Sequence, residues 1–236
     1  MKNETVLVIP CRLESTRLPN KMMKMVGDKS LINTCYDQTR KAWDGKIIIV
    51  TDGNELFLHC LKFIEKDDEV LMVHSVCSNG TERAYKALQY KEYKNVVIVQ
   101  GDELLVDREA LNGILDKLRT YNVVSVVRKE TSKEKAKSKD CVKALLFQDR
   151  IARLIRDDMT DEDEFFEHVG FYGYNIEILK ALSTAPDTPR QKGHSLELMK
   201  PIEMGIRVGS VEIKSNVFNV NTIEDLEKAR ELKRVQ

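Results

Sequence analysis

The first half of this chain alternates short apolar runs with amphipathic segments of helical length. The apolar runs are residues 5–10, 46–50, 70–73, 96–100 and 123–127, and the helical segments are residues 31–43, 55–66, 81–90 and 107–121. Such alternation is typical of βαβ units, in which a crossover helix returns the chain to begin the next parallel strand. Because parallel strands are covered on both faces, this half predicts a doubly wound α/β sheet.

The second half of the chain breaks this rhythm. Residues 141–147 and 151–155 are β-rich runs joined at Gln148, Asp149 and Arg150, which favours an antiparallel hairpin. We expect a helix around 195–204, strands at 208–213 and 218–220, and a last helix with Thr222 as its N-cap. The expected fold is one domain over residues 1–236, with a mixed, mostly parallel sheet and an inserted arm at about 148–190.

Two strongly polar stretches lie in or near this arm. Residues 129–139 are rich in lysine, and we interpret them as a solvated loop or helix. Residues 157–167 hold seven acidic side chains in eleven positions, which indicates a solvated loop, with a cation site as the alternative.

Composition narrows the classes of function. The 38 lysines and arginines balance 38 aspartates and glutamates, so no net positive field exists to hold a nucleic acid. The apolar runs are far shorter than the about 20 residues that span a bilayer, and no secretory signal follows the N-terminus. The five cysteines include no CxxC pair, which argues against a disulfide framework and a zinc site. We therefore expect a cytoplasmic protein with no membrane or nucleic-acid partner.

A basic loop follows the first expected strand directly. Residues 11–21 (CRLESTRLPNK) carry Arg12, Arg17 and Lys21 together with Ser15. Ligands of open α/β sheets bind at the carboxyl edge of the strands, and guanidinium groups match phosphate oxygens in pairs. The loop therefore predicts a polyphosphate site, with an ordinary basic surface loop as the alternative. Neither GxxxxGK[ST] nor GxGxxG is present here, so the nucleotide site must be built differently.

Two further segments follow expected strands. In VQGDE, residues 99–103, Gly101 permits close backbone approach and Asp102 places a carboxylate at the same edge of the sheet. A hard carboxylate oxygen there suits Mg²⁺, although Asp102 as a turn carboxylate that caps the next helix is the alternative. In NGTER, residues 79–83, a glycine before a helix start suits anion or base recognition by backbone N–H groups.

Taken together, these segments resemble the CMP-sugar synthetase family, which activates 3-deoxy-2-ulosonic acids. The resemblance runs nearly end to end, through the segments IPCRLESTRLPNK (9–21), TD (51–52), NGTERA (79–84), VQGDE (99–103), VKALL (142–146), HVGFYGYN (168–175), LELMKPIEMG (196–205) and NVNTIEDLEKAR (219–230). It implies a nucleotide-diphospho-sugar transferase-like fold, with a Rossmann-like nucleotide half and a small dimerisation arm.

The activity implied by this resemblance is that of a Mg²⁺-dependent cytidylyltransferase. Such an enzyme transfers CMP from CTP to the anomeric hydroxyl of an eight- or nine-carbon 3-deoxy-2-ulosonic acid and releases pyrophosphate. Its product would serve lipopolysaccharide or capsule synthesis, and its partners would be CTP, a small acidic sugar and a second copy of the chain in a homodimer.

The same resemblance implies roles for individual residues. Those near the nucleotide are Pro10, Arg12, Ser15, Arg17, Lys21, Thr81 and Arg83. Those on the side of the sugar are Gln100, His168, Tyr172 and Glu197. Within these sets Arg17 and Lys21 would lie closest to the transferred and leaving phosphates, and Asp102 would be the magnesium ligand, so the expected catalytic residues are Arg17, Lys21 and Asp102.

Three departures from the family pattern qualify these roles. Asn221 stands where the family has an aspartate that is the second magnesium ligand, which should weaken metal binding unless Glu224 or Asp225 supplies the missing anion. Leu198 and Lys200 stand where the family has a sugar-binding glutamine and an arginine. The family's SRxxIP loop has no counterpart after residues 153–156. Two other interpretations therefore remain, a cytidylyltransferase for a different acceptor and a catalytically impaired nucleotide-binding relative that serves a partner protein.

Overall fold

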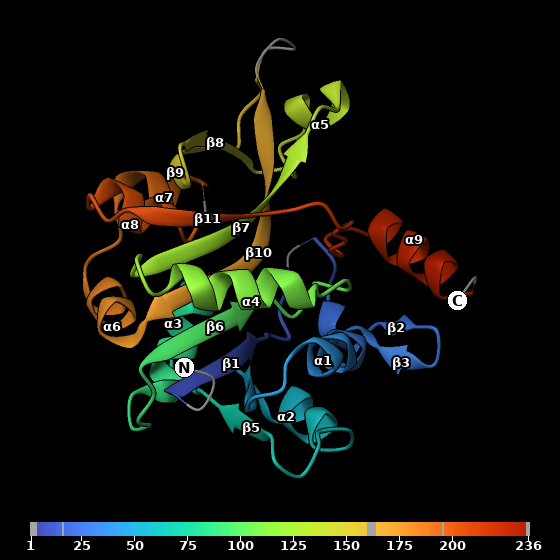
Figure 1. Cartoon of the computed structure of the whole chain (residues 1–236). Coiled ribbons are helices and arrows are strands. Elements are labelled where there is room, and N and C mark those ends of the chain that lie inside the picture. The colour runs from blue at the N-terminus through green and yellow to red at the C-terminus, as the bar shows by residue number, and fades with distance from the viewer. Residues whose placement is uncertain (1–3, 16, 160–163, 195, 235–236) are drawn as a thin grey trace. The chain divides into compact units, whose positions relative to one another are not determined.

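The computed structural model describes residues 4–15, 17–159, 164–194 and 196–234 (Figure 1). The chain forms two compact units. The first unit contains Met1–Tyr93, Ile98–Arg108 and Asn216–Gln236, and the second contains Lys94–Val97 and Glu109–Ser215. Strand β6 (Asn95–Val99) therefore contributes residues to both. The arm expected at about 148–190 lies within the sequence of the second unit, and its role in dimerisation stays a prediction.

The strands of the first unit confirm the parallel sheet expected from the alternating pattern. They follow the order β5-β4-β1, with β1 at Thr5–Pro10, β4 at Ile47–Thr51 and β5 at Glu69–Met72. Both pairings are parallel, and Pro10 lies opposite Val50 while Thr51 lies opposite Met72. Every residue of β1 and β4 is buried, as expected for parallel strands covered on both faces. The carboxyl ends of these strands consequently lie at one edge.

The longer helices of the first unit are α1 (Leu31–Ala42), α2 (Asn54–Cys60), α3 (Gly80–Leu88) and α9 (Ile223–Arg234). Its shorter elements are the 3₁₀ turn η2 (Lys21–Met23) and the strands β2 (Met25–Val26) and β3 (Lys29–Ser30). Side-chain caps fix three helix starts: Ser30 accepts from the Asn33 amide, Asn79 from Glu82, and Thr222 from Asp225. The expected N-cap at Thr222 is thus confirmed.

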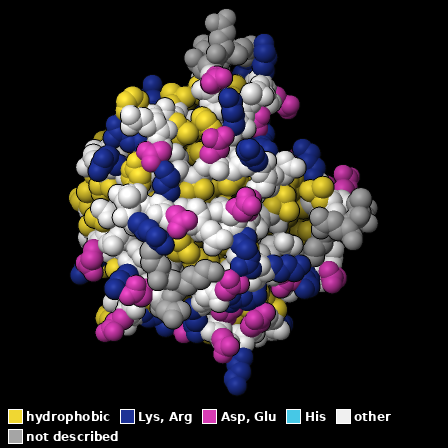
Figure 2. Space-filling model, viewed as in Figure 1, with side chains coloured by type: hydrophobic (Ala, Val, Ile, Leu, Met, Phe, Trp, Pro, Cys, Tyr) yellow, Lys and Arg dark blue, Asp and Glu magenta, His cyan; other side chains and the backbone are white. Residues whose placement is uncertain are grey.

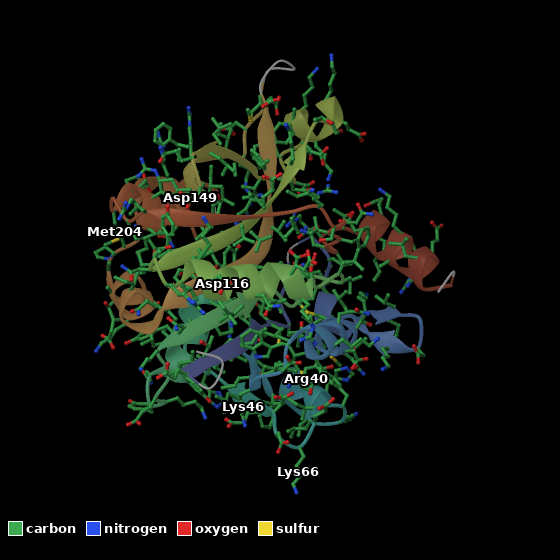
Figure 3. All side chains as sticks on the ribbon, in the orientation of Figure 1. Arg40, Lys46, Lys66, Asp116, Asp149 and Met204 are labelled. Atoms are coloured by element: carbon green, nitrogen blue, oxygen red, sulfur yellow. The ribbon has the colours of Figure 1, made fainter. Side chains whose placement is uncertain are left out.

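A buried carboxylate joins α1 to the start of β4. Asp68 accepts hydrogen bonds from Arg40 at 3.0 and 3.1 Å, from the Tyr36 hydroxyl at 2.7 Å and from the Ile47 amide at 2.8 Å. Arg40 extends from α1, and Figure 3 labels it together with Lys46, which lies just before β4. Because every oxygen of the carboxylate is bonded, Asp68 can remain charged in the interior.

The second unit holds a mixed sheet, as expected. Its strands follow the order β10-β7-β11-β9-β8, with β7 at Val123–Glu130, β8 at Lys143–Phe147, β9 at Arg150–Ile155, β10 at Phe165–Asn175 and β11 at Val208–Ile213. Strands β7 and β11 are parallel, and the other pairings are antiparallel. The expected hairpin is β8–β9, and Gln148 in its turn has a φ of 57°.

The helices of the second unit are α4 (Arg108–Lys117, whose first residue belongs to the first unit), α5 (Lys133–Lys137), α6 (Ile176–Thr184), α7 (Pro189–His194) and α8 (Met199–Glu203). Helix α4 packs on the sheet through Gly113, where a Cβ would lie 2.6 Å from Val211 Cγ1 of β11. A glycine is therefore needed at this contact.

Three expectations about local structure need correction, and some elements were not expected at all. The strand expected at 218–220 is wrong, because this segment makes only an isolated bridge between Glu103 and Asn219. The helix expected at 195–204 is confined to α8, since Leu198 precedes it as N-cap, and residue 195 lies outside the described ranges. Helix α2 ends at Cys60 instead of residue 66, because its last carbonyls accept bonds from tight turns. Strand β10 and helix α6 were absent from the sequence prediction.

The two polar stretches are partly structured. Within residues 129–139, β7 continues to Glu130 and α5 follows, and Lys135 forms 2.9 Å ion pairs with Glu130 and Glu167. In the acidic stretch, residues 160–163 lie outside the described part of the chain, and Phe165 begins β10 with its side chain buried. Figure 2 shows acidic and basic side chains intermixed over the visible face, in keeping with the zero net charge. Among the described helices, none has the length and apolarity to cross a membrane.

Candidate functional site

The basic loop begins where β1 ends, and backbone bonds tie it to the end of β4. The Cys11 amide donates to the Val50 carbonyl at 2.8 Å, and the Leu13 amide donates to Asp52 Oδ1 at 3.1 Å. Asp52 directly follows β4, so the loop is held at the carboxyl edge of the sheet. Sequence reasoning assigned no role to Asp52, although the TD pair after a strand was the available signal.

The start of α3 meets the same edge through Gly80. A Cβ on Gly80 would lie 3.0 Å from Pro10 Cγ and 3.1 Å from Gln100 Oε1, so a larger side chain would press against both of these side chains. This close approach brings the NGTER segment, the end of β1 and the VQGDE segment together, as the sequence predicted. The side chain of Thr81 is buried there.

Arg83 is the second buried member of the NGTER segment. Its side chain is 7% exposed, and its Nη2 lies 3.7 Å from Asp52 Oδ2. Its Nη1 is buried and has no hydrogen-bond partner among the described residues. A buried guanidinium nitrogen of this kind carries an unmet hydrogen bond, which an acceptor atom on a ligand would satisfy.

Two cations of the basic loop are paired within the first unit. Lys21 Nζ donates to Asp102 Oδ2 at 2.6 Å, and the exposed fractions of the two side chains are 8% and 21%. Arg17 Nη2 donates to Asn221 Oδ1 at 2.9 Å. Arg12 is exposed, and Ser15 is half-buried. The structure thus joins the predicted catalytic residues Lys21 and Asp102, and it joins Arg17 to the predicted metal position Asn221.

The segment before α9 is attached to the VQGDE motif. The Val220 amide donates a backbone hydrogen bond to the Asp102 carbonyl at 3.1 Å, beside the bridge of Glu103 with Asn219. The Asp225 carboxylate accepts from the amides of Asn221 and Thr222, both at 3.0 Å. The Asp225 carboxylate therefore stabilises the backbone at the start of α9 and already accepts two hydrogen bonds.

The oxygen donors at this edge suit a magnesium ion that takes most of its ligands from phosphate and water. Asp102 offers a carboxylate oxygen and Asn221 an amide oxygen, and both are hard donors. The two residues are held near each other because the amide of Val220, the neighbour of Asn221, donates to the Asp102 carbonyl. Lys21 and Arg17 donate hydrogen bonds to these oxygens, so their side chains would have to turn toward phosphate before the oxygens could bind a magnesium ion. No group of three His, Cys, Asp or Glu side chains among the described residues is arranged to hold a metal by itself.

The second unit contains the predicted residues His168 and Tyr172, both on β10. Their rings stack with centroids 5.5 Å apart and an interplanar angle of 25°. The pKa of His168 is lowered to about 4, mainly by desolvation and also by the charge of Arg156. The imidazole is therefore neutral at pH 7. Glu197, the third predicted residue of this unit, is half-buried before α8, and Gln100 belongs to the first unit.

Leu198 and Lys200, the two departures in this region, have structural roles. Leu198 is 1% exposed and packs in the core. Lys200 Nζ donates to the Ala185 carbonyl at 2.6 Å and lies 3.3 Å from Asp187. Both side chains are therefore engaged by the protein instead of being presented to a ligand.

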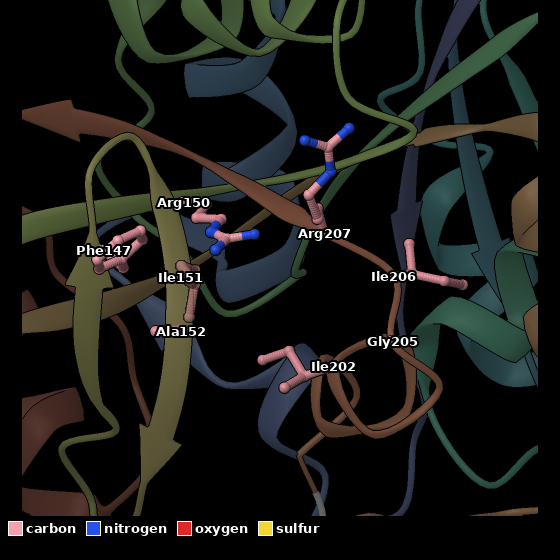
Figure 4. A pocket seen from close by; sticks show the side chains of 8 residues that line it. All are labelled: Phe147, Arg150, Ile151, Ala152, Ile202, Gly205, Ile206 and Arg207. Carbon is pink, nitrogen blue, oxygen red and sulfur yellow. The ribbon is translucent and has the colours of Figure 1, made fainter.

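A pocket elsewhere in the second unit contains none of the predicted site residues. It lies between the β8–β9 hairpin and the segment that joins α8 to β11, and Figure 4 shows the residues that line it. Arg150 and Arg207 are its charged members, and the guanidinium of Arg150 lies 5.2 Å from the centroid of the Phe147 ring.

Comparisons of the sequence with known proteins identify a family of similar proteins. Residues 6–235 match the sequence model of the family described as Cytidylyltransferase. A protein of Elusimicrobium minutum named 3-deoxy-manno-octulosonate cytidylyltransferase is 27% identical over 96% of this chain and 97% of its own length. A protein of the same name from Francisella tularensis is 30% identical, with the same coverage.

Solved structures show the same fold. A structure of CMP:2-keto-3-deoxy-manno-octonic acid synthetase complexed with CTP superposes with a TM-score of 0.87, at 23% identity and 99% coverage of both chains. The 4-diphosphocytidyl-2C-methyl-D-erythritol synthase of Anaerococcus prevotii superposes with a TM-score of 0.68, at 14% identity, covering 99% of this chain and 100% of its own. The predicted nucleotidyltransferase-like fold is thereby confirmed.

Proposed function

Because the chain belongs to the cytidylyltransferase family, we propose that it transfers CMP from CTP to 3-deoxy-manno-octulosonate and releases pyrophosphate. The family model covers nearly the whole chain, and the relatives at 27% and 30% identity carry the name of this activity. The observation that carries the proposal is the pairing of Lys21 with Asp102 and of Arg17 with Asn221 at the carboxyl edge of the first unit.

In this proposal the basic loop holds the triphosphate. Arg12, Arg17 and Lys21 neutralise phosphate charge, which grows on the leaving group as the reaction proceeds. The anomeric hydroxyl of the acceptor attacks the α-phosphorus, the bond from that phosphorus to the bridging oxygen breaks, and the hydroxyl proton passes to water. Positioning of the substrates and neutralisation of phosphate charge account for the rate enhancement, so no covalent intermediate with the protein is needed.

Magnesium would be held by Asp102 and Asn221 together with phosphate oxygens, and it would supply further charge neutralisation. Thr81 and Arg83 contribute to nucleoside binding in this scheme, with the buried Nη1 of Arg83 as a donor. His168, Tyr172, Glu197 and Gln100 contribute to acceptor binding. We further propose that the protein works in the cytoplasm as a homodimer, which light scattering after gel filtration would test.

The proposal is tested by measuring pyrophosphate release from CTP with a panel of 3-deoxy-2-ulosonic acids, followed by mass spectrometry of the products. We expect a CMP conjugate with 3-deoxy-manno-octulosonate, and we expect its formation to require both substrates. CTP binding by calorimetry without turnover of any acceptor would instead support a nucleotide-binding relative that serves a partner protein.

A second candidate is the same transfer to a different acceptor acid or sugar. The observation in its favour is the burial of Leu198 and the engagement of Lys200 with Ala185 and Asp187, which leaves neither side chain for sugar hydroxyls. Turnover of another member of the panel at a higher kcat/KM than 3-deoxy-manno-octulosonate would establish this candidate.

A further inference from the structure

Ser125 occupies a position on β7 to which sequence reasoning gave no role. Its side chain is fully buried, and its Oγ lies 3.1 Å from Nε2 of His168. The same Oγ donates a hydrogen bond to the carbonyl of Phe171, also at 3.1 Å. Ser125 thus connects the predicted sugar-binding histidine to the backbone of β10.

This contact coincides with an irregularity in the β7–β10 ladder. Val169 pairs with Val126 and Tyr172 pairs with Ser125, so Gly170 and Phe171 are additional residues on β10. A bulge removes ladder partners from the backbone groups that it contains, and bulges near active sites redirect side chains. The Ser125 hydroxyl therefore provides a partner for the Phe171 carbonyl.

The hydrogen-bond direction at Ser125 determines the proton position on His168. A serine hydroxyl has one proton, and here that proton is donated to the Phe171 carbonyl. Toward His168 the oxygen can consequently only accept, so Nε2 must carry the ring proton. In a neutral imidazole the other nitrogen, Nδ1, is then a hydrogen-bond acceptor, and the residues that the structure describes give it no partner.

We propose that Ser125 is a positioning residue that fixes His168 in its Nε2-protonated tautomer, so that Nδ1 accepts a hydrogen bond from a hydroxyl group of the acceptor sugar. The proposal rests on the acceptor-binding role given to His168 under the proposed function. In this proposal His168 accepts a hydrogen bond from a sugar hydroxyl. The sugar carboxylate is excluded as its partner, because a carboxylate has no proton to donate at neutral pH.

Stacking on Tyr172 supports this assignment. With centroids 5.5 Å apart and planes inclined by 25°, the Tyr172 ring restricts rotation of the imidazole about its Cβ bond. Desolvation keeps the ring neutral, as the lowered pKa of His168 indicates. A ring fixed in both orientation and tautomer presents its acceptor nitrogen at one place.

The tautomer is measured directly by long-range ¹H–¹⁵N correlation spectra of protein labelled with ¹⁵N-histidine, in the absence of substrates. The chain has four histidines, and His168→Gln identifies the His168 signals by their loss. At pH 7 we expect Nε2-protonated His168 in the wild type and in Ser125→Thr, which keeps the hydroxyl. In Ser125→Ala we expect a mixture of tautomers. Ser210→Ala is the matched control, because Ser210 is buried on β11 opposite Ser125, and it should leave the spectrum of His168 unchanged.

Kinetics supply the second measurement. We expect Ser125→Ala to raise the KM of the acceptor about tenfold while the KM of CTP stays within about twofold, and we expect Ser125→Thr to restore the acceptor KM. Nδ1-protonated or charged His168 in the wild type, or an unchanged tautomer in Ser125→Ala, would overturn the proposal. A shifted tautomer with an unchanged acceptor KM would overturn the role of Nδ1 in sugar binding. If the wild type turns over no acceptor, the proposed function fails, while the spectra still decide whether Ser125 sets the tautomer.

Discussion

Substitution of Lys21 separates the catalytic role of the basic loop from its structural role. Lys21→Ala removes the cation that donates to Asp102 at 2.6 Å and leaves this carboxylate, whose side chain is 21% exposed, without that partner. Breaking a fully buried ion pair costs about 3–5 kcal/mol, whereas an exposed pair contributes about 0–1 kcal/mol. For a pair at this intermediate burial we expect unfolding free energy to fall by about 2 kcal/mol.

The effect on turnover should be larger and should have a separate cause. A charge-assisted contact to phosphate contributes about 1.5–3 kcal/mol, which corresponds to about one to two decades in kcat/KM if the contact acts in the transition state. The double variant Lys21→Ala with Asp102→Asn removes the unpaired charge. We expect it to regain about 1 kcal/mol of stability and no activity, because neither phosphate neutralisation nor the carboxylate is restored.

Urea unfolding followed by circular dichroism and the pyrophosphate-release assay with CTP measure the two effects on the same preparations. Lys46→Ala is the matched control, because Lys46 pairs with Glu69 at 2.9 Å and the two side chains are 31% and 34% exposed. It should cost less than about 1 kcal/mol and leave turnover unchanged. Wild-type kcat/KM in Lys21→Ala would refute the triphosphate assignment of the loop, and a stability loss below about 0.5 kcal/mol would refute the inferred strength of the Lys21–Asp102 pair.

Three further predictions concern the metal position, the base and pH. Asn221→Asp adds a carboxylate beside the proposed magnesium position, where competition from Arg17 limits the net gain to about 1 kcal/mol, so a magnesium titration of turnover should show a roughly fivefold lower half-saturation. Exposed Asn122→Asp adds the same charge in the second unit as a control, and an unchanged or raised half-saturation in Asn221→Asp would contradict the prediction. Calorimetry should show tighter binding of CTP than of UTP or ATP, and equal affinities would remove the base preference. The pKa of His168 is lowered to about 4 in the folded protein from its usual 6.5, so its neutral form contributes stability above pH 6.5 that is lost as pH falls toward 4. His168→Gln should therefore show a shallower fall of unfolding free energy between pH 6.5 and 4, and parallel curves would exclude this linkage.

The sequence by itself determined the elements whose residues form one continuous hydrophobic pattern. Strands at Thr5–Pro10 and Val208–Ile213 were predicted to the residue, and so was the N-cap Thr222, whose Oγ1 accepts a hydrogen bond from the Asp225 amide three residues along the chain. The gathering of the basic loop, the NGTER segment and the VQGDE segment followed from a topological rule, because the carboxyl ends of parallel strands share an edge. These features depend on periodicity and on neighbours in the chain, which the sequence displays directly.

Only the tertiary structure decided which side chains pair across the chain. Arg17 is hydrogen-bonded to Asn221 although the two residues are 204 positions apart in the sequence, and no local sequence pattern predicts such a contact. The acidic stretch concealed the start of β10, since Glu167 is compensated by an ion pair with Lys135 that forms only once the strands align. The proton position on His168 depends likewise on Ser125 and on the Phe171 carbonyl, which a bulge brings within hydrogen-bond distance. Periodicity specifies which face of a strand is buried, whereas hydrogen bonds between polar groups require distances of about 3 Å that only the packed chain establishes.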